Sequence, residues 1–434
     1  MIIYVDADTG NDLNSGTDIS PVRSLVRAAG MVVPGAVIDL AGTFPNQRFR
    51  PYKSGTALEP ITVRGNPAKP AVITNGLSGA MLDLSTGVSW YRFMDNITLD
   101  GGGNAPGQGA PLALAFMNGA SDNVAHGLTL RNNAHAAIRN RAARNTLDTC
   151  LIVDVGNKSL NQGNGIDVDN GSVDVRILNT TVRNAGHGCL QLGGDQPADL
   201  PVTGAVVQDC TFDNPWATPL ILTGQNSGAL IERCKMLNGT READPRAVFP
   251  RPGIEIVSSY NTIRHCTVEN NAGGGVQLQG YIYATYFNQD SIGNMIYNND
   301  IRYNGFSRDG YGYAFILKQL QGRQVKDNII AQNRIFRNSG YKYYDLYQFY
   351  VDLHADVGVG WSVGSLNGNQ IYRNAILRSG GFLSPLTKGE KLLLISRPWA
   401  ATGNTTNPNL WYTLAEMEKT FPGVEGNVEM EVGA

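Results

Sequence analysis

The sequence predicts an all-β chain folded as a single-stranded, right-handed parallel β-helix, a solenoid with an N-terminal capping helix and a non-repeat C-terminal segment. Three observations predict it: an internal repeat of short apolar strands, 51 glycines, and a length of 434 residues. A chain of this length is too long for one ordinary compact core. A solenoid avoids that limit, because each coil buries its apolar face only against its neighbours. The 42% hydrophobic content can fill such a core, and glycine suits many tight turns.

The repeat consists of a short apolar strand, one or two Asn, a Gly-containing turn and a second short strand. Its copies start at Leu128, Cys150, Thr181, Cys210, Cys234, Cys266, Asp300, Arg334 and Ala375. The step from Cys210 to Cys234 fits one bare coil, and the longer steps that follow indicate loops inserted on one face. A β-propeller is the alternative, but its blades of about 40–45 residues fit the shortest step poorly.

The cysteines occupy equivalent places in this repeat. Cys150, Cys210, Cys234 and Cys266 each open the same strand of their coils, which predicts an inward stack of small residues. Parallel neighbours lie about 4.8 Å apart, within reach of a disulfide, although the stack needs none. The Asn residues that follow this strand predict a ladder of turns, because Asn tolerates left-handed backbone.

The two ends depart from the repeat, which divides the chain into three segments. Residues 1–50 are an N-terminal cap, residues 51–382 the β-helix, and residues 383–434 a C-terminal cap or oligomerisation segment. Within the first segment, Ser20 is the predicted N-cap of a helix with Pro21 at its first position. That helix is suited to close the open end of the solenoid.

Charge and hydropathy exclude several classes of partner. A net charge of −2 without a polybasic stripe gives no footprint for nucleic acid. No apolar run reaches the roughly 18 residues of a membrane span, so no membrane partner is expected. The N-terminus lacks the basic and apolar regions of a signal peptide. We therefore expect an extracellular protein whose signal was removed, or a protein of a virion tail.

The N-terminal segment resembles the cap of pectate-lyase-like parallel β-helix proteins. The resemblance rests on the stretch from Tyr4 to Thr17, on Ser20-Pro21, Pro34-Gly35 and Gly42-Thr43-Phe44, and it extends over roughly residues 1–380. This family includes polysaccharide lyases, epimerases, glycosidases and phage tailspikes. The resemblance implies a polysaccharide as partner and, for a tailspike depolymerase, a homotrimer.

A second, local resemblance concerns glycosidases of the polygalacturonase type. Gly186-His187-Gly188 is similar to their Gly-His-Gly, and Gly163-Asn164-Gly165-Ile166-Asp167 is similar to their Asn-Thr-Asp-Gly strand. However, Asn164 stands where that family has its acid, and the family's Asp-Asp pair and Arg-Ile-Lys are missing. We therefore interpret His187 as a turn residue.

Side chains that point outward from the second strand of each coil form two columns on one wall, because side chains alternate along a strand. The first column is Asp167, Gln191, Ile221, Glu255, Gln277, Ile316 and Asp352, and the second is Asp169, Gly193, Thr223, Val257, Gln279, Lys318 and His354. Acids, amides and tyrosines bind sugar hydroxyls and ring faces. The predicted substrate-binding residues are Asp167, Asp169, Gln191, Gln277, Gln279, Tyr313 and Tyr343.

Two reactions compete for this wall. A lyase neutralises a uronate carboxylate and removes the C5 proton with a base. The alignment puts Lys318 and His354 in adjacent coils of one column, so a lyase acting on an acidic polysaccharide is favoured. The predicted catalytic residues are Lys318, His354, Glu255, Asp352, Arg251 and Tyr311. The residues indicate no particular cofactor, Asp and Glu oxygens make Ca²⁺ a candidate, and metal dependence stays open.

A glycoside hydrolase is the alternative reaction, since it needs two carboxylates. Asp167 with Asp195, or Glu255 with Asp244, would provide such a pair. A third alternative is a tail fibre or adhesin that binds glycan without catalysis. The sequence leaves these three open.

Overall fold

The computed structural model of the chain consists of two units, which are described separately. Unit 1 comprises Met1–Gln191 and Leu200–Thr211, and unit 2 comprises Leu192–Asp199 and Phe212–Ala434. The structure describes residues 1–74, 79–102, 112–133, 135–156, 163–194, 199–224, 226–239, 251–280, 290–305, 313–320, 323–336, 338, 349–354, 368–378, 393–396, 410–412, 416, 418–419 and 424–431.

Each unit is a stack of coils whose strands form three parallel sheets. We name them the first, second and third sheets in the order in which each coil visits them. One coil of unit 1 contributes β9 (Val124–His126), β10 (Thr129–Arg131) and β11 (Ile138–Asn140). The central residues Ala125 and Leu130 are fully buried, because alternate side chains of so short a strand point inward.

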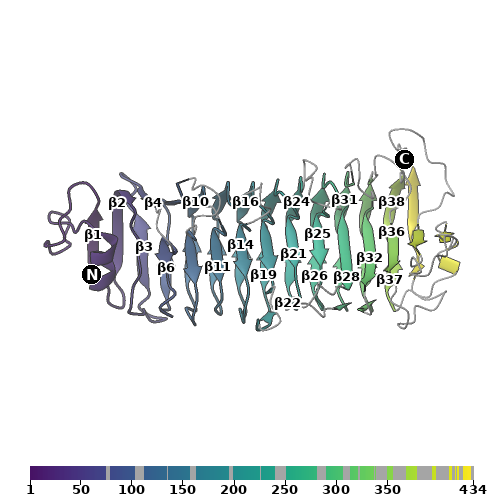
Figure 1. The fold of residues 1–434 in the computed structure, drawn as a ribbon, viewed down its shortest axis with the longest axis horizontal. Coiled ribbons are helices and arrows are strands. Elements are labelled where there is room, and N and C mark those ends of the chain that lie inside the picture. The colour runs from purple at the N-terminus through teal and green to yellow at the C-terminus, as the bar shows by residue number, and fades with distance from the viewer. Residues whose placement is uncertain are drawn as a thin grey trace, which may run out of the picture. The chain divides into compact units, whose positions relative to one another are not determined.

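In unit 1 the ladders follow the predicted coil order. The first sheet contains β1 (Ile2–Asp6), β2 (Val37–Pro45), β3 (Ile61–Gly65), β6 (Tyr91–Phe93), β9, β12 (Thr146–Asp148), β15 (Arg176–Leu178) and β19 (Val206–Gln208). The second contains the end of β2, β4 (Ala71–Thr74), β7 (Ile97–Asp100), β10, β13 (Leu151–Val153) and β16 (Thr181–Arg183). The third contains β5 (Leu82–Asp83), β8 (Leu114–Phe116), β11, β14 (Ile166–Val168) and β17 (Leu190–Leu192). A short strand, β18 (Val202–Thr203), lies outside these ladders, and Figure 1 shows β11 and β14 side by side.

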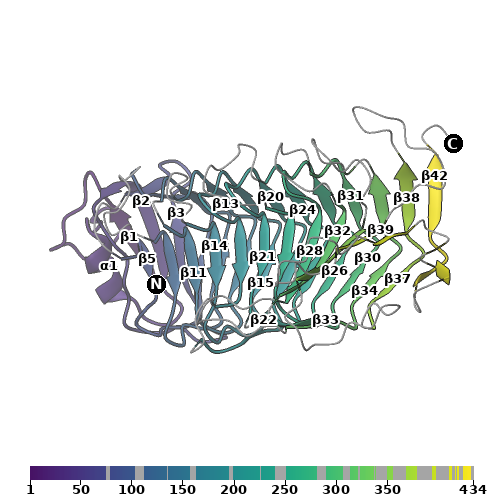
Figure 2. The ribbon, with the colours of Figure 1, turned by 45° about the vertical axis from the view of Figure 1, so that its right-hand side comes forward.

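Unit 2 repeats the arrangement. Its first sheet contains β23 (Leu230–Glu232), β26 (Thr262–Arg264), β30 (Met295–Tyr297), β34 (Ile329–Ala331), β37 (Gln370–Tyr372) and β41 (Val424–Glu425). Its second contains β20 (Thr211–Asp213), β24 (Lys235–Leu237), β27 (Thr267–Glu269), β31 (Asp300–Arg302), β35 (Arg334–Phe336), β38 (Ala375–Arg378) and β42 (Val428–Glu431). Its third contains β21 (Leu220–Leu222), β25 (Ile254–Ile256), β28 (Val276–Gly280), β32 (Phe315–Leu320), β36 (Phe349–His354), β39 (Leu393–Ser396) and the antiparallel β40 (Leu410–Tyr412). Short strands are β22 (Asn226–Ser227), β29 (Ser291–Ile292) and β33 (Val325–Lys326), and Figure 2 shows β26, β30, β34 and β37 side by side.

Buried asparagines connect successive coils of unit 2 at three turns, of which the repeat predicted only the turn after the second-sheet strand, at Asn271, Asn304 and Asn338. Asn299, Asn333, Asn374 and Asn427 each come directly before a strand of the second sheet, and each side-chain amide donates to the carboxamide oxygen of the next at 2.9–3.0 Å. The residue before each of the first three has a positive φ of 52–56°. Similar ladders run through Asn261, Asn294, Asn328 and Asn369, and through Asn271, Asn304 and Asn338.

The cysteines occupy the same turn position in earlier coils. Cys150, Cys210, Cys234 and Cys266 each directly precede a strand of the second sheet, and all are buried free thiols. The backbone N–H of Cys234 lies 3.4 Å from Cys266 Sγ. In unit 2 the predicted stack is thus confirmed, without a disulfide among the described cysteines.

The N-terminal helix was placed too early by the sequence. α1 spans Leu25–Met31, and Ser24, not Ser20, is its N-cap, accepting a hydrogen bond from the backbone of Arg27. The reason is a parallel bridge between Val22 and Val5, which keeps the chain extended beyond Pro21. The buried face of α1 packs against β1, and Figure 2 shows the two together.

Strand pairing also extends into both terminal segments. β2 joins the first two sheets of unit 1 before residue 50. At the other end, β41 and β42 continue the ladders of unit 2 up to Glu431, so pairing persists where the sequence repeat is lost. In the described part of the chain, no helix is long and apolar enough to cross a membrane.

Candidate functional site

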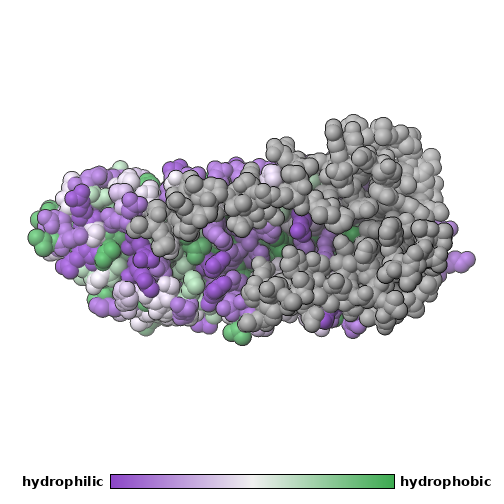
Figure 3. All heavy atoms as spheres, viewed as in Figure 1, coloured by the Kyte–Doolittle hydropathy of each residue, from purple (hydrophilic) through white to green (hydrophobic). Residues whose placement is uncertain are grey.

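The outward face of the third sheet in unit 1 carries a column of polar side chains. Register places Asp83 beside Ala115, Ala115 beside Arg139, and Arg139 beside Asp167. In the space-filling view of Figure 3, hydrophilic side chains cover the visible surface where Figure 1 places β11 and β14. We call this face the unit 1 wall.

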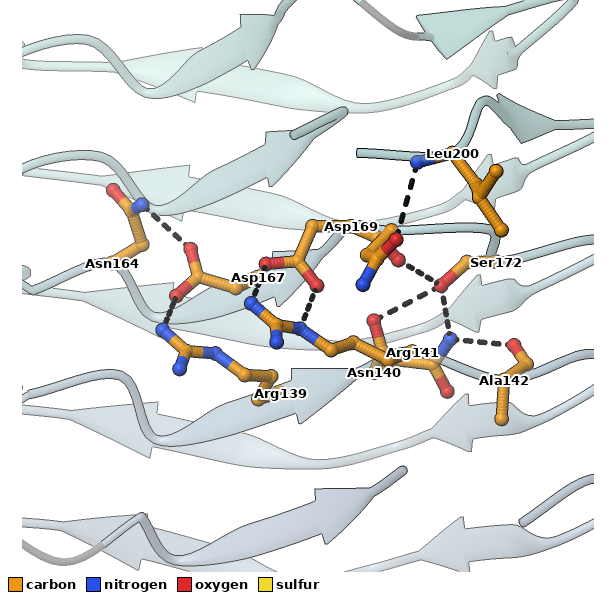
Figure 4. Close-up of polar contacts among 10 residues, drawn as sticks. Arg139, Asn140, Arg141, Ala142, Asn164, Asp167, Asp169, Ser172 and Leu200 are labelled. Atoms are coloured by element: carbon orange, nitrogen blue, oxygen red, sulfur yellow. Dashed lines mark hydrogen bonds and ion pairs between the residues drawn. The ribbon is translucent and has the colours of Figure 1, made fainter. Parts of the chain in front are cut away.

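Asp167 is the centre of a polar cluster on this wall. Its Oδ1 accepts a hydrogen bond of 2.6 Å from Asn164 Nδ2, and its Oδ2 lies 3.4 Å from Arg139 Nη2. Figure 4 shows both contacts. Asp167 is only 8% exposed, so its carboxyl group is largely removed from water.

Asn164 connects Asp167 to the next coil, and its orientation is fixed by four contacts. Its Oδ1 accepts from the backbone N–H of Gly188 at 2.8 Å and lies 3.0 Å from His187 Nδ1. Its Nδ2 donates to Asp167 and, at 3.0 Å, to Gln191 Oε1. An amide oxygen only accepts, so His187 Nδ1 carries a proton and Nε2 is the basic nitrogen of the neutral ring.

A close approach of backbone holds this arrangement together. A Cβ on Gly165 would lie 2.7 Å from the carbonyl oxygen of Cys189, so only glycine fits. The backbone N–H of Gly165 donates to Gly188 at 3.0 Å, and that of His187 donates to Gly163 at 3.0 Å. Two consecutive coils are thereby joined directly beneath the Asn164–His187 contact.

A second acid–base pair lies two residues further along the same strands. Asp169 accepts two hydrogen bonds from Arg141, at 2.6 and 3.1 Å. Beneath this pair, buried Asn140 donates at 2.8 Å to both the Ala142 carbonyl and Ser172 Oγ. Figure 4 shows how these contacts fix the end of β11.

The electrostatics of the cluster shift the pKa of Asp167 upward from that of a free carboxyl group. Burial raises the pKa of Asp167, as does the charge of Asp169, whereas the Asn164 hydrogen bond and Arg139 lower it, and the net shift is upward. When Asp167 is protonated, Arg139 and Arg141 face a single carboxylate, and the Asp167 cluster carries one positive charge in excess.

The structure brings together some predicted residues and adds others that sequence reasoning missed. Asp167, Asp169 and Gln191 lie on the unit 1 wall, as predicted. Arg139 and Arg141 were missed, although extending the outward columns by one coil to Ile138-Arg139-Asn140-Arg141 would have found them. The structure shows His187 within the cluster, where the sequence indicated a turn residue.

Unit 2 presents its own polar wall on the third sheet. Register places Glu255 beside Gln277, and Glu255 Oε2 lies 3.4 Å from Arg251 Nη1. The Tyr313 hydroxyl donates to Gln277 Oε1 at 3.2 Å, and Gln277 Nε2 donates to Gln279 Oε1. These five predicted residues therefore do lie close together.

The predicted pairing of Lys318 with His354 is wrong. Lys318 pairs with Asp352, and His354 pairs with Leu320. Aligning the coils by their apolar pattern equated Val351 with Phe315. In the structure Phe349 pairs with Phe315, so the register differs from the predicted one by two residues. Both choices put an apolar residue inward, which is why the pattern did not separate them.

Several predicted residues lie outside the part that the structure describes. These are Tyr311, Tyr343, Asp195 and Asp244, together with the side chains of Lys318, Asp352 and His354. Among the described residues, no group of three or more His, Cys, Asp or Glu is placed to hold a metal ion.

Comparisons with known proteins agree with the fold. The family model for the right-handed beta helix region matches residues 157–281. The native GH136 lacto-N-biosidase of Eubacterium ramulus is 14% identical, with a TM-score of 0.55 over 99% of this chain and 68% of that one. A search of the curated proteins finds no match to the sequence.

Two further solved structures are similar. The complex of XylC with xylose is 10% identical, with a TM-score of 0.58 over 93% of this chain and 87% of that one. The A-module of the Azotobacter vinelandii mannuronan C-5 epimerase AlgE4 is 14% identical, with a TM-score of 0.50 over 85% and 92%. At such identities the likeness concerns the fold. The chain is a right-handed parallel β-helix protein, and the predicted resemblance is confirmed at that level.

Proposed function

We propose that this chain cleaves an acidic polysaccharide by β-elimination at the Asp167 cluster of the unit 1 wall. The observation that carries the proposal is the line of contacts from Asp167 through Asn164 to His187, with Arg139 beside it. It combines an acid, a base and a cation, the three groups that elimination from a uronate requires.

Each group has one task. Arg139 pairs with the uronate carboxylate and stabilises the negative charge that develops there. His187 Nε2 takes the C5 proton, and the C5–H electron pair forms the double bond to C4. The C4–O bond breaks, and the leaving oxygen takes the proton of Asp167. His187 ends protonated and Asp167 ionised, and solvent restores both.

The raised pKa of Asp167 supports the acid role, because a general acid must hold its proton near the working pH. The guanidinium group of Arg139 beside Asp167 supports an anionic substrate. The similar epimerase is named for a mannuronan, and inversion at C5 would begin with the same proton removal. Elimination differs from epimerisation because an acid protonates the leaving oxygen, which is the role that we propose for Asp167.

One observation favours a second candidate, inverting glycoside hydrolysis. Asp167 and Asp169 are two residues apart along the chain, so their Cα atoms lie about 6.7 Å apart. Carboxyl groups with the same spacing would fall within the roughly 6.5–9.5 Å of inverting enzymes. Asp169, however, gives both oxygens to Arg141, which leaves it poorly placed to activate water. We therefore place hydrolysis second.

The test is a panel of alginate, polygalacturonate, bacterial capsules and neutral xylan. Elimination produces ultraviolet absorbance of an unsaturated uronate, hydrolysis produces reducing ends without it, and epimerisation changes the sugar signals by NMR without cleavage. Binding without any product would indicate a glycan-binding tail fibre or adhesin. An extracellular or virion-tail location and a homotrimer stay predictions.

The matched variants are His187→Gln and His126→Gln. His126 lies on the first sheet, with its Nδ1 3.0 Å from Asp148, so its replacement also removes a hydrogen-bonded imidazole. Elimination at the proposed site requires loss of activity in His187→Gln alone. Equal activity in both variants would place the reaction elsewhere, with the unit 2 wall as the next site to test.

A further inference from the structure

A second group of cations lies on the unit 1 wall, apart from the Asp167 cluster. Arg48 Nη1 and Arg50 Nε both lie 3.5 Å from the same oxygen of Asp83. The Asp83 side chain is 7% exposed, whereas those of Arg48 and Arg50 are 38% and 40% exposed. We call these three residues the anchor cluster. Two guanidinium groups share one carboxylate, so the cluster carries one positive charge in excess.

The sequence places these residues by strand alternation. Phe49 is fully buried and forms a parallel bridge to Leu82, the residue before Asp83. Arg48 and Arg50 flank Phe49 and therefore point to the opposite, outward side. The backbone N–H of Asp83 donates to Phe49 at 2.9 Å, which fixes Arg50 directly beside Asp83.

The guanidinium groups of the anchor cluster keep surface that a ligand can reach. Each guanidinium has five N–H donors in a planar fork, and the side chains of Arg48 and Arg50 are 38% and 40% exposed. A ligand carboxylate can accept from the exposed part of these groups, because guanidinium binds carboxylates in a planar, two-pronged fashion.

Register relates the anchor cluster to the Asp167 cluster. Along the outward column the order is Arg50, Asp83, Ala115, Arg139 and Asp167. Arg50 and Arg139 are three strands apart, or about 14 Å at a strand spacing of about 4.8 Å. One sugar ring cannot reach both. Each cation is followed by an acid, and the small side chain of Ala115 separates the two groups.

We infer that the anchor cluster is a remote subsite that binds a carboxylate of an acidic polysaccharide while Arg139 holds the sugar that reacts. The ligand class rests on the proposed function. The subsite gives the polysaccharide a direction, from β14 towards the N-terminal coils. Only an oligosaccharide that is long enough to reach both Arg139 and the anchor cluster can bind both. Affinity should therefore increase with the length of the oligosaccharide.

The experiment compares Arg48→Gln/Arg50→Gln with Arg64→Gln/Arg131→Gln. Arg64 and Arg131 each pair with an aspartate on the first and second sheets and are 46% exposed, so the control removes the same charge away from the wall. Binding of oligogalacturonates and oligomannuronates, from dimer to octamer, is measured by calorimetry in a His187→Gln background, which prevents cleavage. Xylo-oligosaccharides are the neutral probe.

We expect the anchor variant to bind the octamer about tenfold more weakly, equivalent to about 1.4 kcal/mol, with the dimer affected less than about twofold. The control variant keeps the affinity of the parent. Equal losses for dimer and octamer, no loss at all, or no binding of either acidic series by the parent would overturn the subsite. Arg48→Lys/Arg50→Lys, which keeps the charge, is expected to recover part of the octamer affinity, and unchanged melting temperatures exclude misfolding.

This outcome is separate from that of the proposed reaction. Length-dependent binding that needs Arg48 and Arg50, without any unsaturated product in the His187-containing chain, would retain the subsite and reject elimination. Product formation with the same KM for the octamer in the anchor variant would retain elimination and reject the subsite.

Discussion

Asn164 donates from its side-chain amide to Asp167 at 2.6 Å and comes from the turn that precedes the same strand. Its other side-chain atom accepts from the next coil, at Gly188 and His187. A residue that bonds in both directions aligns a carboxyl group and an imidazole that are separated by one coil. The rest of the candidate mechanism depends on that alignment.

Replacing Asp167 tests both its acid role and its raised pKa. We expect Asp167→Asn to lower elimination by about 10²–10⁴-fold, the usual contribution of a general acid. Asn keeps the shape and still accepts from Asn164. Rates on the best polysaccharide of the panel provide the measurement, and a loss below about threefold would remove Asp167 from the mechanism.

The same variant has a distinct effect on stability. Folding raises the Asp167 pKa, so the folded chain holds this proton more tightly than the unfolded chain. The stabilisation that proton binding at Asp167 gives the folded chain is therefore fully present below the ordinary pKa of 3.8. It is lost as the pH rises through the raised pKa. We expect the melting temperature of Asp167→Asn, relative to wild type, to increase from acid to neutral pH. A constant difference across this range would contradict the raised pKa.

Asp6 is expected to show the opposite pH dependence. Partial burial raises its pKa, but hydrogen bonds from Lys69 and from the backbone of Thr9 and Asp8 outweigh it and lower the pKa to about 2. Its stabilisation is present above 3.8 and is lost as the pH falls towards 2. We expect Asp6→Asn to lose about 1–2 kcal/mol at neutral pH, discounted for exposure of the pair. The measurement is the free energy of unfolding of wild type and Asp6→Asn, from denaturant titrations near pH 7 and near pH 2.5. The same difference between the two proteins at both pH values would contradict the lowered pKa.

The asparagine ladder of unit 2 should be a major source of local stability. Buried Asn333 donates to Ile296 and Asn374 and accepts from both nitrogens of Asn299. We expect Asn333→Ala to cost roughly 3 kcal/mol, because it leaves several buried groups unpaired. Hydrogen exchange of backbone amides measures this loss of stability coil by coil, which suits a solenoid whose coils open separately. Exposed Gln370→Ala is the control, and equal exchange in both variants would argue against the ladder.

All five cysteines should be unreactive in the folded chain. Each is a buried free thiol, and burial raises the pKa of Cys150 to about 11. Since the thiolate is the reactive form, we expect a thiol reagent to label none of them under native conditions and all of them in denaturant. Rapid labelling of Cys150 at neutral pH would show that its turn is open.

The sequence predicted the coils well because the repeat is local. The residues of a single coil determine the strand length, the inward apolar positions, the positions of the cysteines and the Asn turns. The helix start was misplaced at Ser20, because Val22 pairs with Val5 of β1, and the capping pattern at Ser20-Pro21 does not reveal that pairing. Lys318 was misaligned with His354, because a strand of apolar residues permits registers that differ by two.

The sequence by itself determined a parallel β-helix and which residues of each coil face outward, since side-chain alternation depends only on neighbours along the chain. Only the tertiary structure decided which outward residues meet across coils. Arg139, Asp167 and His187 come from three consecutive coils, and their approach depends on register and on turn length between them. Those are properties of hydrogen bonds between strands, and the sequence of one strand does not contain them.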